Sequence, residues 1–340
     1  MIMLPILFLA LLLAGCRFQK NEDYLSLKQT TCINGLFFLC VFFRHVSFLS
    51  HSGQFLNVMA QRLDNYAGQL IVVPFLLYSG YGIAESIRTK PDYVRHIPSK
   101  KIFRTWLQFA VYVLIFLIMQ LNFGSQYPSY VIVLSLVGWL SVGNLNWYIF
   151  AILMLWLGTW ISFSIFKKGI KPYLAMTVYT LAYILVLRIV NKDSNWFDTV
   201  IAYNIGMFIS LLKPVLQKIY NNTLLWCILT LSSLTALVFL SVAFRNSFIL
   251  MALKTGFLSA ALVLISMRMK IGNPITYAVG KNLLAFYLVH YIPIAFLRHF
   301  VYMKNHPYIY ALSCALITVI LVFGYVKLLG IIRQKKSAHA

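Results

Sequence analysis

Apolar runs of membrane-spanning length repeat along almost the whole chain. They are about 17 to 25 residues long, hold few charges, and are separated by short polar connections. Hydrophobic residues make up 61% of the 340 residues, and charged residues only 11%. A soluble domain of this size could not bury so much apolar surface, and barrel strands would alternate over shorter segments. The sequence therefore predicts an all-α integral membrane protein, built as a polytopic bundle of transmembrane helices.

These runs divide the chain into three parts. We expect residues 1–25 to form an apolar segment with a cytosolic connection, residues 26–336 a single membrane domain, and residues 337–340 the tail. The connections between runs are too short to hold a soluble domain. The candidate spans are Cys32–Leu49, Tyr66–Ala84, Ile102–Leu121, Tyr130–Val142, Trp147–Phe166, Tyr173–Val190, Thr199–Leu212, Leu224–Phe244, Phe248–Met267, Leu283–Phe300 and Tyr308–Ile332.

Positive charge indicates which connections face the cytosol. The formal net charge is +22, and cytosolic loops of membrane proteins carry the excess of Lys and Arg. Leu121 would then end outside and Lys167 begin inside, so the stretch between them must cross an odd number of times. We therefore expect the short segment Tyr130–Val142 to be re-entrant or interfacial, which leaves about ten core crossings. The protein is expected in the inner (plasma) membrane, with its C-terminus in the cytoplasm and His45 toward the outer leaflet. The basic residues that define the inside are Arg88, Lys90, Arg95, Lys100, Lys101, Arg104, Lys167, Lys168, Lys171, Lys213, Lys218, Arg268, Lys270, Lys281, Lys327, Arg333, Lys335 and Lys336.

The first sixteen residues allow two interpretations. Residues 13–16 match the cleavage box of a lipoprotein and follow a short apolar run. The leading residues carry no positive charge, however, and lipidation at Cys16 would place Arg17, Lys20 and Lys28 outside. We therefore expect a short additional apolar helix in this region.

The polar residues disfavour several classes of protein. All seven acidic residues lie in or beside polar connections: Glu22, Asp23, Asp64, Glu85, Asp92, Asp193 and Asp198. Proton-coupled transporters usually relay protons through buried carboxylates, so this class is disfavoured. The five cysteines are odd in number and lie mostly in apolar runs, which predicts neither a disulfide framework nor a metal site. Membrane lipid accounts for the basic loops, and nothing indicates nucleic acid as a partner.

An Arg44–His45 pair interrupts the first long apolar run. Ionisable groups are costly in lipid, so a histidine in such a run is a candidate functional residue. With an ordinary pKa of about 6.5, a neutral imidazole can accept a proton at physiological pH. The alternative is a histidine that only hydrogen-bonds for helix packing.

Other polar and small residues also allow two interpretations. Lys101 and Arg104 are spaced three apart and would project from one side of a helix, as ordinary cytosolic anchors or as a phosphate-binding pair. Tyr287 and His290 share the same spacing and would either bond between helices or line a cavity. Ser79, Gly80 and Gly82 would permit close backbone approach at a site or simply close packing of helices.

Four segments carry motifs in a fixed order. The first is CINGLFFLCVFFRH, with its histidine near the end of the first core helix, and the second is VVPFLLYSGYGIAESI, followed by the basic run SKKIFRTW. The third is NLNWYIFAILMLWL and the fourth is GKNLLAFYLVHYIPI. Together, from about Ser26 to Ile294, they resemble the membrane-bound acyltransferase family 3, whose members O-acylate glycans and other small hydroxylated acceptors.

The resemblance implies a role for each candidate residue. His45 would be the catalytic base, while Lys101 and Arg104, with Lys100 beside them, would hold the phosphates of the donor acetyl-CoA. Two positions depart from the family pattern: Asn34 stands where a basic residue is common, and Lys101 replaces the first arginine of a basic pair. An amide can hydrogen-bond but supplies no charge, whereas lysine remains a competent phosphate partner. The supporting residues would be Asn34, Ser79, Gly80, Tyr81, Trp147, Tyr287 and His290.

The implied function is an integral membrane O-acyltransferase that acetylates a cell-surface polysaccharide or its lipid-linked precursor. The donor would dock from the cytosol and the acceptor would meet His45 from the external side, so the acyl group would pass through the bundle. A flippase or carrier for lipid-linked sugars is an alternative that leaves its cargo covalently unchanged. A polysaccharide polymerase is another, although such enzymes usually carry a large external loop with several arginines and this chain offers Arg62 alone near residues 50–65. A non-catalytic membrane scaffold is the last.

Overall fold

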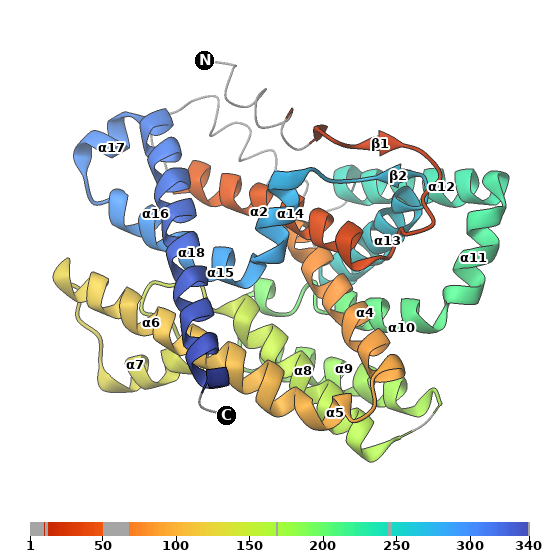
Figure 1. The fold of residues 1–340 in the computed structure, drawn as a ribbon, viewed down its shortest axis with the longest axis horizontal. Helices are drawn as coiled ribbons and strands as arrows, with labels where there is room; N and C mark the ends of the chain where they lie inside the picture. Colours follow the sequence, from red (N-terminus) through yellow and green to blue (C-terminus); the bar gives the residue numbers. More distant parts are fainter. Residues whose placement is uncertain (1–9, 11–12, 50–67, 168, 244–246, 339–340) are drawn as a thin grey trace. The chain divides into compact units, whose positions relative to one another are not determined.

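The structure, a computed structural model, describes residues 10, 13–49, 68–167, 169–243 and 247–338 (Figure 1). These residues are almost entirely helical, which confirms the predicted all-α class. Within the described residues the strands are two short ones, β1 (Arg17–Phe18) and β2 (Met269–Lys270), which pair with each other. Most of the expected N-terminal apolar helix, the external connection near residues 50–65 and the last two residues of the tail lie outside the described residues.

The helices follow the predicted apolar runs closely. Three short elements of other helix types accompany them: the 3₁₀ helices η1 (Gly68–Val72) and η3 (Ser194–Trp196), and the π-helix η2 (Ile97–Phe103). The α-helices are α2 (Leu27–Leu49), α4 (Val73–Thr89), α5 (Tyr93–His96), α6 (Arg104–Asn122), α7 (Ser129–Leu136), α8 (Trp147–Ile165), α9 (Lys171–Ile189), α10 (Ile201–Leu211), α11 (Lys213–Asn221), α12 (Thr223–Ala243), α13 (Phe248–Ser266), α14 (Pro274–Lys281), α15 (Leu283–Val289), α16 (Tyr291–Leu297), α17 (Val301–Asn305) and α18 (Pro307–Ala338).

Several of these helices are long and apolar enough to cross a bilayer. Among the described residues seven meet this condition, and two bent helix pairs raise the number to as many as nine. Helix α2 is 23 residues long, about 35 Å at a rise of about 1.5 Å per residue, and so also has the length of a span. The chain is therefore a multi-pass membrane protein, and the count of ten crossings stays a prediction.

Three segments refine the predicted spans. Helix α7 holds eight residues, about 12 Å, too short for a hydrocarbon core of about 30 Å, in agreement with a segment that does not cross. The run Leu283–Phe300 reaches the length of a span only together with α14, which precedes Leu283–Leu297 directly and meets it at a bend of 76°. Helices α10 and α11 form the second bent pair, again at 76°, with Pro214 at the start of α11.

The chain divides into two compact units. Unit 1 comprises Met1–Arg17, Ser26–Gly68 and Lys270–Ala340, and unit 2 comprises Phe18–Leu25 and Gln69–Met269. In unit 1, α2 and α14 cross with their backbones in contact, because a Cβ added to Gly35 would lie 1.8 Å from the carbonyl oxygen of Thr276. A Cβ added to Gly280 would likewise lie 1.9 Å from the carbonyl oxygen of Thr31. This close crossing fixes α2, the helix that carries His45.

In unit 2, α4 and α10 make an equally close crossing. A Cβ added to Gly80 would lie 1.9 Å from the carbonyl oxygen of Tyr203, and one added to Gly206 would lie 1.9 Å from that of Leu77. Small residues commonly allow transmembrane helices to approach in this manner. Gly80 therefore packs against α10, as one of its two predicted roles requires, and Gly82 on the same helix faces open space.

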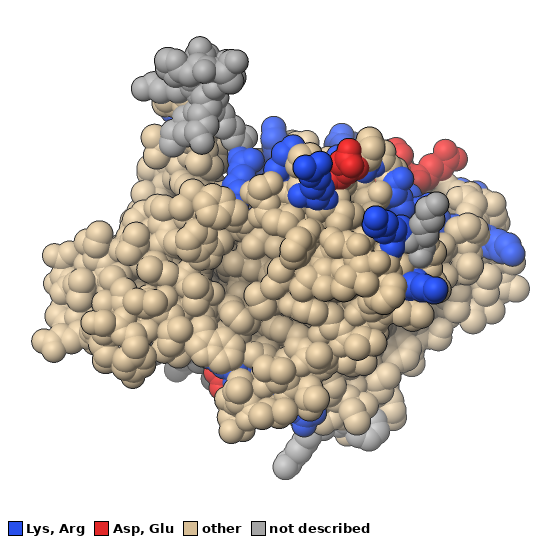
Figure 2. Space-filling view, turned by 90° about the horizontal axis from the view of Figure 1, so that it is seen from below, with Lys and Arg blue, Asp and Glu red and all other residues tan. Residues whose placement is uncertain are grey.

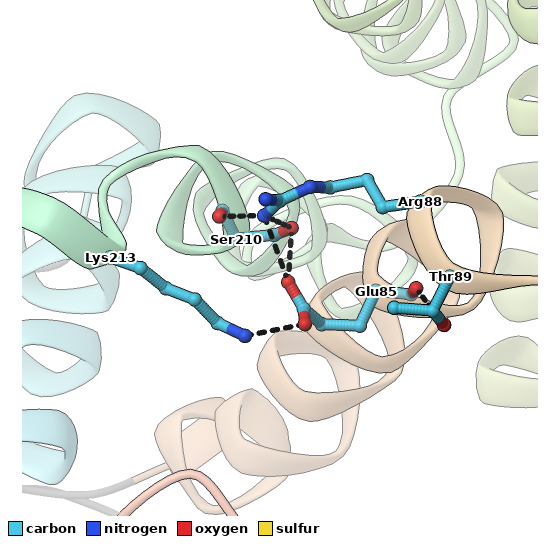
Figure 3. A network of polar contacts seen from close by, with 5 residues as sticks. All are labelled: Glu85, Arg88, Thr89, Ser210 and Lys213. Carbon is cyan, nitrogen blue, oxygen red and sulfur yellow. Dashed lines mark hydrogen bonds and ion pairs between the residues drawn. The ribbon is translucent and has the colours of Figure 1, made fainter.

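A polar network closes the end of the α4–α10 pair (Figure 3). The Glu85 carboxylate accepts hydrogen bonds from the Ser210 hydroxyl, at 2.6 Å, and from the Lys213 ammonium. The Arg88 guanidinium pairs with Glu85 at 3.2 Å and also donates to the backbone carbonyl of Ser210. These contacts tie the bend between α10 and α11 to α4.

The surface is dominated by uncharged side chains. Figure 2 shows broad areas without a single Lys, Arg, Asp or Glu, and exposed Leu, Ile, Val and Phe side chains run along α6, α9, α12 and α18. A soluble monomer rarely exposes apolar patches of such extent. Lipid chains are the environment in which this surface is stable.

Candidate active site

The site begins with two histidines of unit 1 that lie 245 residues apart in the chain. His45 lies near the C-terminal end of α2, and His290 lies at the junction between α15 and α16. The Nδ1 atom of His45 lies 2.9 Å from Nε2 of His290, and the two rings stack with centroids 5.2 Å apart and planes 9° from parallel. The sequence named both residues but did not predict that they form a pair.

The two rings differ in their surroundings. His290 is fully buried, and its Nδ1 lies 3.0 Å from the carbonyl oxygen of Phe286 and 2.8 Å from that of Tyr287. The rings of Phe38 and His290 pack in a T-shaped arrangement with centroids 5.3 Å apart. His45, in contrast, keeps a partly exposed surface. The His290 imidazole is therefore enclosed and held at both nitrogens, while His45 is less completely buried as a residue.

Two other polar residues lie on the same helix as His45. The Arg44 guanidinium donates a hydrogen bond of 3.4 Å to the carbonyl of Gly68. Asn34 lies three turns before His45, and its side-chain oxygen is buried without a hydrogen-bond partner among the described residues. A buried acceptor of this kind is costly, which indicates a position built to meet a donor.

The predicted donor-binding residues lie in unit 2, on the π-helix η2 and the start of α6. The Lys101 ammonium lies 5.3 Å from the ring centroid of Trp156 on α8. The indole N–H of Trp156 in turn donates a hydrogen bond of 3.2 Å to the Ser79 hydroxyl on α4. Two predicted site residues, Lys101 and Ser79, therefore meet at a tryptophan that the sequence analysis did not select. An indole N–H inside an apolar run needs a hydrogen-bond partner, and on this ground Trp156 could have been selected from the sequence.

The three cations of the basic run do not share one environment. Lys101 is half-buried against Trp156, whereas Lys100 and Arg104 are exposed. The π-helix ends at Phe103, so Lys101 lies in a wider turn than Arg104, which begins α6. The spacing of three along a single α-helix therefore does not describe this pair, although both remain near the same helix end.

The remaining predicted residues have structural partners. The Tyr81 ring lies under the Lys213 ammonium, with 5.6 Å between nitrogen and centroid. Trp147 begins α8, and its ring meets that of Tyr148 edge to face at 5.9 Å. Tyr287 is buried, and its ring centroid lies 6.0 Å from that of His290. Of these, Tyr287 joins the histidine pair.

A further cation that the sequence analysis did not select is held by two indoles. The Lys192 ammonium lies 4.2 Å from the ring centroid of Trp139 and 4.3 Å from that of Trp196, and it donates a hydrogen bond of 2.6 Å to the Trp139 carbonyl. Burial lowers the pKa of Lys192, and the neighbouring Asp193 raises it by a smaller amount. These contacts fix the turn after α7 to the end of α9.

In the part of the chain that the structure describes, no three His, Cys, Asp or Glu side chains come together to hold a metal ion. The free cysteines there include Cys32 and Cys314, which are buried. The histidine pair supplies imidazole, a base able to take and return one proton.

Comparison with known proteins identifies a family. The sequence model of an acyltransferase 3 family, described as an acyltransferase domain, matches residues 31–326. This range includes every residue of the histidine pair and of the Lys101–Trp156–Ser79 contact. No curated protein and no solved structure matches the chain.

Proposed function

Because the chain belongs to the membrane-bound acyltransferase family 3, we propose that this membrane acyltransferase moves an acetyl group from acetyl-CoA to a hydroxyl of a cell-surface polysaccharide or its lipid-linked precursor. The observation that carries the proposal is the imidazole of His45, a partly buried residue, hydrogen-bonded at Nδ1 to the enclosed His290. An activating base oriented by a third group is the usual arrangement for acyl transfer.

The chemistry requires one proton to move twice. His45 takes the proton of the acceptor hydroxyl as its oxygen attacks the carbonyl carbon of the thioester. The carbon–sulfur bond then breaks, and the leaving CoA thiolate takes that proton back from the His45 imidazolium. The products are an O-acetyl ester and free CoA, and the enzyme returns to its starting state.

Lys101 is the residue that we assign to the donor phosphates. Its ammonium rests on the Trp156 ring, which holds the long side chain in place before a ligand arrives. The exposed side chains of Lys100 and Arg104 add positive charge at the same helix end. The charge favours an anionic ligand such as CoA, and the sequence predicts that this end faces the cytosol.

The same proposal covers location and partners. The protein resides in the inner (plasma) membrane with its C-terminus in the cytoplasm, its lipid contacts are those of a multi-pass bundle, and its acceptor is a glycan. The family assignment favours acyl transfer over the flippase, polymerase and scaffold alternatives, because each of these lacks a covalent acyl step. His45 and Lys101 belong to different units, and a passage between them stays a prediction.

The test is release of CoA by the purified full-length protein in proteoliposomes. Acetyl-CoA is supplied with lipid-linked or soluble glycan fractions, and the glycan is then examined by NMR for new O-acetyl groups. His45→Ala should abolish acetyl transfer, while the exposed His306→Ala should leave it unchanged. Full transfer by His45→Ala, or glycan movement without an acetyl group, contradicts the proposal.

A further inference from the structure

We propose that His290 is a positioning residue that fixes the tautomer of His45, so that the His45 Nε2 atom is the one that takes the proton. The inference rests on the proposed function, because it specifies how the same site works. Hydrogen bonds at both nitrogens of His290, described above, carry the argument.

The protonation of His290 follows from its partners. Carbonyl oxygens only accept hydrogen bonds, so the Nδ1 atom that faces those of Phe286 and Tyr287 must carry the hydrogen. In a neutral imidazole one nitrogen donates and the other accepts, so Nε2 of His290 is an acceptor. The Nδ1 atom of His45 lies within hydrogen-bond distance of this acceptor, at 2.9 Å.

The tautomer of His45 then follows in turn. Its Nδ1 must carry a hydrogen in order to donate to Nε2 of His290. The remaining nitrogen of His45, Nε2, therefore has a free lone pair. This is the protonation state that a general base needs, and no movement of the ring is required to reach it.

The setting of His290 suits a fixed support better than a catalytic base. Its side chain has no exposed surface, and Phe38 and Tyr291 pack against its ring. A substrate hydroxyl has no open face to approach on this ring. His45 is the less buried residue of the two, and only one of its ring nitrogens is engaged by His290, so the two histidines have distinct roles.

A neutral imidazole also supports His45 at a lower energetic cost than a charged side chain would in an apolar bundle. In hydrolases with a catalytic triad, a buried carboxylate holds the corresponding nitrogen of the histidine. The described part of unit 1 contains no Asp or Glu at all. A second imidazole supplies the same acceptor without placing an unpaired charge in an apolar bundle.

His290 acts on the reaction only through His45. When Nε2 of His45 takes the hydroxyl proton, the ring becomes an imidazolium whose Nδ1–H remains donated to His290. When the CoA thiolate takes the proton from Nε2, the original tautomer is restored. His290 neither gains nor loses a proton in either step.

A matched pair of variants tests this role. In His290→Gln the side-chain oxygen can reach the position of Nε2 and accept from His45, whereas the shorter side chain of His290→Asn can bond only to the nearby carbonyls. We expect kcat to fall at least about tenfold in His290→Asn, with the KM values for acetyl-CoA and acceptor unchanged, and to be largely retained in His290→Gln. Combining either change with His45→Ala should cause no further loss.

The outcomes separate this inference from the proposed function. Full activity in His45→Ala refutes the function. If His45→Ala is inactive, two results refute the positioning role and leave the function standing. One is an unchanged kcat in His290→Asn, and the other is an equal loss of kcat in the Gln and Asn variants. If His290→Asn does not fold, His290→Gln alone is sufficient for the test. A kcat of His290→Gln as low as that of His45→Ala overturns the inference.

Discussion

The packing of Gly80 against α10 gives a prediction whose size follows from the structure. A methyl group at this position would lie 1.9 Å from the carbonyl oxygen of Tyr203, far inside ordinary van der Waals contact. The obstacle is backbone rather than a flexible side chain, so Gly80→Ala must push α4 and α10 apart by more than about 1 Å. Overpacking of this kind costs about 1–3 kcal/mol, and the crossing here is tight enough to reach the upper part of that range.

An opposing effect must be subtracted. Alanine is favoured over glycine in a helix by about 0.5–1 kcal/mol, so Gly80→Ala should lose about 2 kcal/mol of folding free energy overall. Gly82→Ala on the same helix is the matched control, because nothing lies within 4 Å of its added Cβ. That variant should gain up to about 1 kcal/mol.

Thermal unfolding in detergent, followed by size-exclusion chromatography, measures the difference. At about 2–4 °C per kcal/mol for a domain of 150–250 residues, the Gly80→Ala protein should melt several degrees below Gly82→Ala. Gly206→Ala should behave like Gly80→Ala, because its methyl group would meet the Leu77 carbonyl oxygen at 1.9 Å. Equal melting temperatures for the two α4 variants would refute the close crossing.

Two further predictions concern cations held by tryptophan. Burial lowers the pKa of Lys192, so between that value and its ordinary 10.5 the unfolded chain binds more protons and the free energy of unfolding should rise with pH. The melting temperatures of Lys192→Met and of the unaltered protein, compared from pH 8 to 10.5, isolate this rise. If the unaltered protein instead loses stability relative to Lys192→Met as the pH increases, the indole faces favour the charge more than burial disfavours it. Trp156→Leu removes the ring under Lys101 and should raise the KM for acetyl-CoA about fivefold, equivalent to about 1 kcal/mol, whereas Trp156→Phe should raise it less. A KM for acetyl-CoA in Trp156→Leu no higher than that of the unaltered enzyme would exclude a role for the ring in donor binding.

The pattern of apolar residues along the sequence was sufficient to predict the helices and the short segment α7. Apolar length predicted most spans within a few residues, because lipid forces each backbone polar group to bond within its own helix. It was insufficient at Asn282 and at Leu212, where α14 and α10 meet their successors at bends of 76°. A bend depends on the partners that the freed backbone groups find, and those partners come from elsewhere in the chain.

The same reasoning explains what could be known of the site. His45 and His290 were each conspicuous because each is an ionisable group in an apolar run, and lipid makes such a residue costly unless it is paired. The cost shows that a partner exists but not which residue it is, since the pairing joins α2 to a helix junction 245 residues away. The Trp156 indole and the Ser79 hydroxyl, on α8 and α4, illustrate the same limit. In a chain of this composition the sequence therefore identifies the members of each polar contact, and only the fold assigns them to pairs.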